Sequence, residues 1–212
     1  MIDVWKYPLL KIGVFGACLM PLAVLAGQAL THNLGANPID EIADRTGIWT
    51  LRMLLITLAV TPARRLTGWN RLSQLRRMLG LFAFFYGSLH FVTYIWLDQF
   101  FAVEEIIADV MERPFITVGF ASFVLLIPLA LTSTAAMIKR LGGKRWQRLH
   151  RLVYAIAIGG VVHYLWLVKA DIRQPLLYGS ILGALLVYRL WDRYGRRLLV
   201  GIPQLRKAAV RR

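Results

Sequence analysis

The sequence contains little cysteine and little acidic charge. Its one cysteine, Cys18, lies inside an apolar stretch, so neither an intramolecular disulfide nor a thiolate metal cluster can form, and any metal must use other ligands. Asp and Glu number 11 against 26 Lys and Arg, which gives a net charge of +15. These basic residues lack the interleaved aromatic side chains on which bases stack, so they do not indicate nucleic-acid binding. The sequence also lacks a G-x-G-x-x-G fingerprint, which argues against direct binding of NADPH.

Apolar residues dominate the composition. They make up 58% of the chain, and the mean hydropathy of +0.55 is well beyond that of a soluble domain. They form six runs of roughly 17 to 24 residues, each long enough to cross a ~30 Å hydrocarbon core as a helix. The predicted helices cover residues 9–30, 47–63, 78–97, 115–138, 151–169 and 175–192. We therefore predict an all-α bundle of six transmembrane helices that forms a single domain over residues 1–212.

Lys and Arg concentrate in alternate loops. The basic residues are Arg64, Arg65, Arg71, Arg76 and Arg77, then Lys139, Arg140, Lys144, Arg145, Arg148 and Arg151, and in the tail Arg193, Arg196, Arg197, Arg206, Lys207, Arg211 and Arg212. The other loops carry Asp40, Glu41, Asp44, Asp98, Glu104, Glu105, Asp109, Glu112 and Asp171. The positive-inside rule puts the basic loops in the cytoplasm and the acidic loops in the periplasm. We expect a multi-pass protein of the bacterial inner membrane with both termini in the cytoplasm.

Two of the four histidines lie inside predicted helices. His90 is thirteen residues beyond Arg77 in the third helix, and His163 is twelve beyond Arg151 in the fifth. At ~1.5 Å per residue both imidazoles lie about 18 to 20 Å beyond the cytoplasmic surface. Two neutral imidazoles that face each other at one depth are the axial ligands that a six-coordinate heme iron requires. No carboxylate lies near either histidine in its helix, which disfavours a mixed-ligand site for non-heme iron or zinc.

Small residues precede both of these histidines. They are Gly80, Gly87 and Ser88 before His90, and Gly159 and Gly160 before His163. Such residues leave room for a macrocycle, but they equally favour close packing between helices. We predict a heme between the third and fifth helices, with His90 and His163 as its iron ligands, and leave the role of the small residues open.

His150 lies at the predicted cytoplasmic surface, within GKRWQRLHR. It is thirteen residues before His163, about 20 Å along the helix axis, which is too far for both to bind one iron. Three alternatives stand: an inner heme with His150 as a ligand, contact with a flavin, or packing at the membrane interface. Arg76, Arg77 and Arg148 surround the same end, where guanidinium groups suit a flavin phosphate or heme propionates. Equally, these arginines could serve only to set the topology.

Several segments resemble a known family. They are RRMLGLFAFFYGSLHFVTY around His90, RPFITVGF and LTSTAAM along the fourth helix, GKRWQRLHRLVY at His150 and VHYLW at His163. In this order and at these intervals they resemble the MsrQ family, the heme-binding membrane subunits of periplasmic methionine sulfoxide reductases in the ferric-reductase-like superfamily. The resemblance implies that His90, His150 and His163 are heme-associated. It also places Arg77 where other members of the superfamily carry a fourth histidine.

The resemblance further implies cofactors and partners. Members bind heme b and FMN, and they take electrons from the quinone pool or a flavin reductase. They deliver them to a periplasmic molybdopterin enzyme that reduces methionine sulfoxide in oxidised envelope proteins. We therefore expect an electron-transfer subunit without catalytic residues of its own. The alternatives are a stand-alone transmembrane metal reductase, or a small transporter or assembly scaffold with structural histidines.

Overall fold

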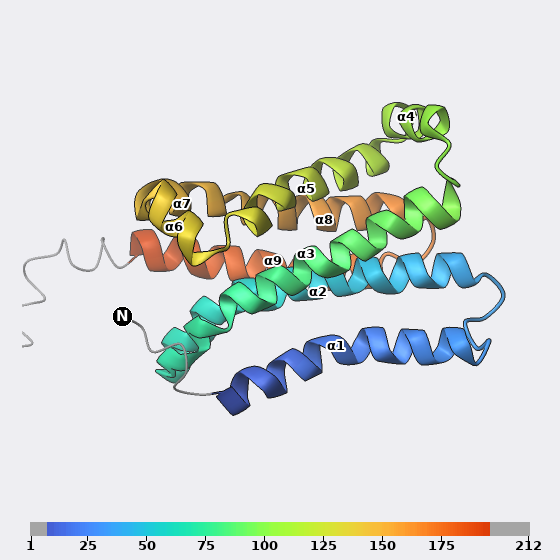
Figure 1. The fold of residues 1–212 in the computed structure, drawn as a ribbon. Coiled ribbons are helices and arrows are strands. Elements are labelled where there is room, and N and C mark those ends of the chain that lie inside the picture. The colour runs from blue at the N-terminus through green and yellow to red at the C-terminus, as the bar shows by residue number, and fades with distance from the viewer. Residues whose placement is uncertain (1–7, 196–212) are drawn as a thin grey trace, which may run out of the picture.

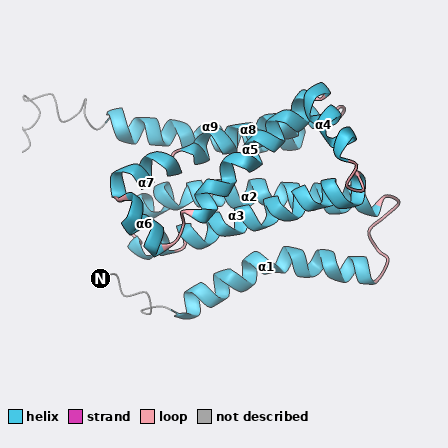
Figure 2. Ribbon diagram, turned by 45° about the horizontal axis from the view of Figure 1, so that its top comes forward, coloured by secondary structure: helices cyan, strands magenta, loops and turns pink. Residues whose placement is uncertain are grey.

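The protein is a bundle of helices that run along a common direction (Figures 1 and 2). A computed structural model describes residues 8–195. The helices are α1 (Pro8–Leu30), α2 (Pro38–Thr67), α3 (Arg76–Val92), α4 (Val103–Glu112), α5 (Pro114–Leu131), α6 (Ala135–Leu141), α7 (Gly143–His150), α8 (Leu152–Leu167) and α9 (Arg173–Leu190). Short turns of other helix types cover Asn70–Gln74, Thr93–Asp98 and Trp191–Gly195. The described residues contain no strand, so the predicted all-α class is confirmed.

Helix α2 begins nine residues earlier than predicted, at Pro38 instead of residue 47. The side chain of Asn37 caps it by accepting a hydrogen bond from the amide of Asp40, and Pro38 suits the first helical position because it needs no N–H donor there. The carboxylates of Asp40 and Glu41 also stabilise the start of the helix, because they lie at the positive end of its dipole. Hydropathy alone assigned these polar residues to a loop, whereas they are the start of a helix of 30 residues.

The predicted helix over residues 115–138 is two helices. Helix α5 ends at Leu131, and the hydroxyl of Thr132 donates back to the carbonyl of Pro128 at 2.6 Å. Thr134 then caps α6 by accepting from the amide of Met137 at 3.2 Å. The predicted loops at both ends of this segment also contain helices, because α7 follows α6 and the amphipathic α4 precedes α5.

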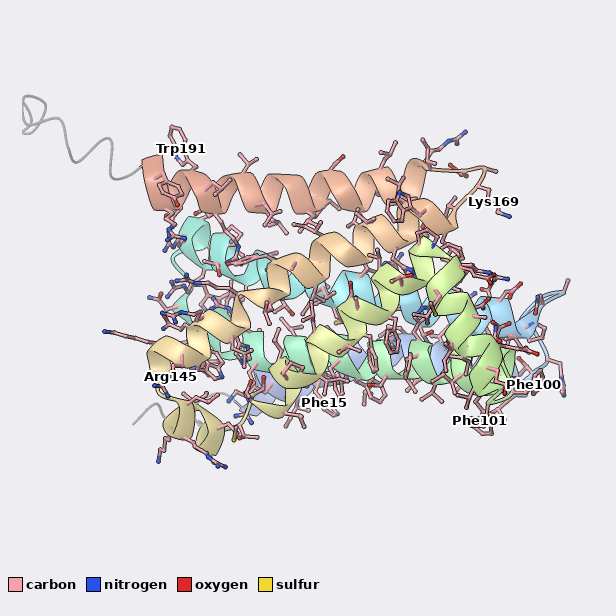
Figure 3. All side chains as sticks on the ribbon, turned by 90° about the horizontal axis from the view of Figure 1, so that it is seen from above. Phe15, Phe100, Phe101, Arg145, Lys169 and Trp191 are labelled. Carbon is pink, nitrogen blue, oxygen red and sulfur yellow. The ribbon has the colours of Figure 1, made fainter. Side chains whose placement is uncertain are left out.

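Four of the described helical segments are long and apolar enough to cross a membrane: α1, α2, α3 with its continuation to Asp98, and α5. Helices α8 and α9 run the length of the same bundle but are not among them, so six spans stay a prediction. The two basic loops lie at one end, where α2 ends, α3 begins and α6 and α7 lie; we call it the basic end. The opposite, acidic end carries α4. Figure 3 shows Arg145 at the basic end and Lys169 at the acidic end. The basic residues from 196 onward lie outside the described residues.

The core lies between α2, α3, α5, α8 and α9. Buried side chains such as Leu54, Tyr86 and Ile156 form its main cluster. Helices α5 and α8 approach closely because Gly159 faces the side chain of Ser122. Helix α1 lies at the edge of the bundle (Figures 1 and 2), where the hydroxyl of Tyr86 donates to the carbonyl of Cys18 at 2.7 Å. The packed helices thereby surround the half of the bundle that contains His90 and His163.

Candidate functional site

A cavity of about 530 Å³ lies between α2, α3, α5 and α8, toward the acidic end. Its volume falls within the range of about 300 to 1,000 Å³ that is typical of cofactor pockets. Leu51, Leu54 and Leu126 are among the apolar side chains that line its inner part. His90 and His163 both contribute to its wall. The structure therefore brings the two predicted membrane histidines into one cavity.

Helix α2 fixes the ring of His90. Its Nδ1 lies 2.9 Å from the carbonyl oxygen of Ala43. A carbonyl can only accept, so Nδ1 carries the proton and Nε2 keeps a free lone pair. Gly47, one turn after Ala43, makes this contact possible, because a Cβ atom there would lie only 3.1 Å from Cε1 of the ring.

Helix α5 fixes His163 in the same way. Nδ1 of His163 donates to the carbonyl oxygen of Phe115 at 2.7 Å, which again leaves the lone pair on Nε2. Gly119 follows Phe115 by one turn, and a Cβ atom at this position would lie 2.7 Å from Nδ1 and 2.9 Å from Cε1. Both imidazoles are thus oriented by a main-chain carbonyl, and both reach it across a glycine.

The two imidazoles come close to each other in the wall of the cavity. Their ring centres are 6.1 Å apart, and their planes are inclined by 74°. A bond of about 2.0 Å from a metal to each nitrogen, plus about 1.1 Å from that nitrogen to the ring centre, would give a separation of about 6.2 Å. The gap between His90 and His163 therefore fits one metal atom held by an imidazole on each side.

Other side chains do not complete a metal site. Among the described residues, no group of three or more His, Cys, Asp or Glu side chains could hold a metal ion. A metal held only by His90 and His163 would need its remaining ligands from a cofactor. A porphyrin supplies four nitrogens in a plane and leaves two axial positions for imidazoles. The donor set and the cavity volume both fit a heme.

The mouth of the cavity is polar. Tyr94, Asp98 and Arg113 contribute to its lining on the side of the acidic end. Arg113 forms an ion pair with Asp109 of α4 at 3.2 Å, and the hydroxyl of Tyr94 donates to the same carboxylate at 3.2 Å. These contacts attach α4 to the end of the bundle beside the mouth.

His150 lies outside this cavity, at the end of α7. Its ring stacks on Trp146 with 3.9 Å between ring centres, and its Nε2 lies 3.1 Å from the hydroxyl of Thr132. That hydroxyl donates to Pro128, so it accepts from Nε2–H of His150. Burial lowers the pKa of His150 below its usual value, because the charged ring would lose solvation. The structure therefore shows a histidine whose Nε2 is already engaged by Thr132.

The three predicted arginines are also at the basic end. A side-chain nitrogen of Arg76 donates to the hydroxyl of Thr61 at 3.0 Å. Arg77, at the start of α3, and Arg148, in α7, are exposed. None of the three lines the cavity of His90 and His163.

The sequence matches the family described as "Ferric reductase like transmembrane component" over residues 46–161. A protein of Herminiimonas arsenicoxydans is 57% identical over 191 residues, which are 89% of this chain and 88% of the relative. Relatives from Azospira oryzae and Rhodospirillum rubrum are 53% and 52% identical, over 87% and 88% of this chain and 79% and 90% of their own lengths. All three are named "Protein-methionine-sulfoxide reductase heme-binding subunit MsrQ". This chain belongs to the MsrQ family.

The glycines that shape the site of this MsrQ-family protein differ from those that the sequence suggested. Gly47 and Gly119 contact the two histidine rings, yet they lie in other helices than the histidines. Of the glycines near each histidine in sequence, Gly87 and Gly160 line the cavity, whereas Gly159 serves the packing of α5 on α8. The sequence offered one signal for Gly47 and Gly119: each is a glycine at about the same depth in the membrane as the histidine that it contacts in the neighbouring helix.

Sequence reasoning also missed Arg52, in the middle of the membrane helix α2. Its guanidinium lies over the ring of Trp49 at 4.8 Å, and its Nε donates to the hydroxyl of Tyr178 at 2.9 Å. Within residues 8–195 it forms no ion pair. A lone cation at membrane depth is costly and usually marks a functional region. Arg52 follows Leu51, a lining residue of the cavity in this MsrQ-family protein, so its main chain lies beside the site, but its own side chain does not line the cavity.

Proposed function

We propose that this protein is the heme-binding, electron-transferring membrane subunit of a protein-methionine-sulfoxide reductase. The observation that carries the proposal is the neighbouring pair of imidazoles, 6.1 Å apart at their centres, each with Nδ1 engaged by a carbonyl. The names of relatives that are 52 to 57% identical support it. When bound, heme b would supply one-electron redox chemistry at membrane depth.

In this proposal His90 and His163 would hold the heme iron. The carbonyls of Ala43 and Phe115 fix the tautomer and the orientation of each ring, and a hydrogen bond from Nδ1–H increases the basicity of the ligating nitrogen. Apolar side chains around the cavity exclude water and stabilise the less charged oxidation state. The chain contributes no catalytic residue, and the sulfoxide is reduced on a partner subunit.

The proposed path of electrons runs from the basic end to the acidic end. The electron donor, quinol or a flavin reductase, reaches the cytoplasmic side, where His150 and the arginines Arg76, Arg77 and Arg148 lie. The acceptor is a periplasmic molybdopterin methionine sulfoxide reductase at the acidic end. This direction rests on the charge difference between the loops in a bacterial inner membrane. FMN, the second cofactor that the resemblance implies, stays a prediction for the basic end.

Spectroscopy of the purified protein tests the heme. We expect a Soret band, a low-spin spectrum and heme b in a pyridine hemochrome assay. Each of the substitutions His90→Ala and His163→Ala should abolish the low-spin spectrum, because the iron then lacks one axial ligand. His32→Ala is the matched control, since His32 is exposed in the loop after α1.

Two results would contradict the proposal. A wild-type protein without a Soret band, after expression with sufficient heme, would favour a transporter or scaffold. Wild-type spectra in both His90→Ala and His163→Ala would show that the heme binds elsewhere. To test the partner, the reduced protein would be mixed with a periplasmic sulfoxide reductase and methionine sulfoxide; heme reoxidation that requires both additions is expected.

A further inference from the structure

Three guanidinium groups from three helices meet at the basic end. Nitrogens of Arg76 and Arg189 lie 3.0 and 3.4 Å from the hydroxyl oxygen of Thr61. The positive charges of Arg189 and Arg64 both act on Arg76. Thr61 and Arg64 belong to α2, Arg76 begins α3, and Arg189 is in the last turn of α9. We call Arg64, Arg76 and Arg189 the arginine cluster.

The main chain and Tyr154 hold Arg189 in place. Pro62 has no N–H, so the carbonyl of Leu58 lacks its usual donor within α2. Arg189 supplies that donor at 2.7 Å with one terminal nitrogen, and its other terminal nitrogen donates to the hydroxyl of Tyr154 at 2.6 Å. The guanidinium of Arg189 is therefore oriented before any ligand binds.

Two donors of the cluster remain unused. The Nε atoms of Arg64 and Arg189 are buried and have no hydrogen-bond partner among the described residues. A buried donor without a partner is unfavourable, especially on a charged group, so such atoms usually indicate a bound water or ion. The side chain of Arg76, by contrast, is exposed.

Among residues 8–195, the charge of the region is only partly compensated. Arg64, Arg65, Arg76 and Arg189 carry four positive charges, and Asp192, which pairs with Arg65, carries one negative charge. Four minus one leaves three positive charges in the region. In addition, α3 begins at Arg76 without a side-chain cap, so the amides of its first turn face the same end.

We infer that Arg64, Arg76 and Arg189 form a binding site for a phosphoryl group at the basic end of the bundle. Guanidinium forks match phosphate oxygens in geometry, and a phosphoryl group brings up to about two negative charges at neutral pH. The site is outside the cavity of His90 and His163, so it does not depend on the proposed binding of heme there. Its phosphoryl group comes either from the headgroup of an anionic phospholipid or from a soluble phosphate.

Two binding measurements on the delipidated full-length protein distinguish these sources. The first titrates inorganic phosphate, with chloride at equal ionic strength as reference, and follows the melting temperature. The second adds phosphatidylglycerol, with phosphatidylcholine as reference, and counts retained lipids by native mass spectrometry. We expect saturable binding in one of them: phosphate stabilisation indicates a soluble ligand, and selective retention of phosphatidylglycerol indicates a lipid.

The variant is Arg64→Gln combined with Arg76→Gln, because Arg189 also stabilises the kinked α2. We expect it to weaken the observed binding at least tenfold. The control, Lys139→Gln combined with Arg140→Gln, removes the same charge from exposed side chains of α6 at the same end and should bind like wild type. No saturable binding by wild type in either measurement would overturn the inference. So would an equal loss in the control, or binding by a folded double variant that matches wild type.

Discussion

Adding one methyl group at Gly119 tests the proposed role of His163 without touching its ring. In Gly119→Ala, the new Cβ atom would lie 2.7 Å from Nδ1, whereas ordinary contacts begin at 3.4 Å. The ring or the helix must therefore move by about 0.7 Å, while metal–ligand distances tolerate only about 0.2 Å. The ring cannot simply retreat, because the same Nδ1 donates to Phe115 at 2.7 Å.

The magnitude follows from this overlap. Overpacking of this kind costs about 1 to 3 kcal/mol, and 1.4 kcal/mol corresponds to a factor of ten. If that strain is expressed when the iron binds, Gly119→Ala should weaken heme affinity by about 5- to 150-fold. Alanine also favours a helix over glycine by up to about 1 kcal/mol, so the variant should still fold.

The assay is a heme titration of the purified apoprotein, followed in the Soret band, beside the melting temperature of each variant. Gly47→Ala should have a smaller effect, because its Cβ atom would lie 3.1 Å from the ring of His90. Gly16→Ala is the matched control, since a Cβ atom there meets nothing within 4 Å. Wild-type heme affinity and a low-spin spectrum in Gly119→Ala would refute the assignment of His163.

Four further predictions concern His150, Arg52 and the topology. His150→Gln should keep the low-spin spectrum but slow heme reduction by quinol or reduced flavin in stopped-flow measurements; loss of the spectrum at unchanged protein abundance would contradict this. Burial lowers the pKa of His150 in the folded protein, so its neutral form stabilises the fold above about pH 6.5, and this contribution is lost as pH falls. The melting temperature of wild type should therefore drop more than that of His150→Gln between about pH 7.5 and 5.5. Arg52→Met should lower the heme midpoint potential by a few tens of millivolts, since a nearby cation stabilises the reduced state, and an unchanged potential in a redox titration would count against it. Reporter fusions should place the basic loops in the cytoplasm and the acidic loops in the periplasm, and one reversed signal would contradict the topology. The informative positions are Arg77, Arg148, Asp44, Glu105 and Asp171.

The helical class follows from composition, but helix boundaries depend on local capping. Each apolar run that hydropathy located lies within a helix or helices of the structure, because apolar residues form the part of a helix that faces lipid or the core. It placed the start of α2 nine residues too late, since it counts Asp40 as a loop residue while the helix dipole favours a carboxylate there. It also joined α5 to α6, because Thr132 and Thr134 are weak in hydropathy and decisive as caps.

For the candidate site, the sequence could predict how deep each residue lies along its helix, but not which residues of neighbouring helices meet. Depth needs only the rise per residue, and it put His90 and His163 at one level. Which faces of the helices meet depends on their rotation, and a single sequence does not determine that rotation. The contacts of His90 with Ala43 and of His163 with Phe115 span 47 and 48 residues, so no local pattern contains them.

The two halves of the candidate site are built alike, and this similarity indicates which contact sets the distance between the rings of His90 and His163. In each half, one helix supplies a carbonyl and, one turn later, a glycine, while its neighbour supplies the histidine. Each ring is therefore fixed within its own helix pair, α2 with α3 or α5 with α8. The distance between the rings then depends on how one pair packs on the other, where Phe91 of α3 stacks on Phe123 of α5 at 4.6 Å. A pair of merely structural histidines would be satisfied by the two carbonyls at any separation, so the 6.1 Å gap is the feature that favours ligation.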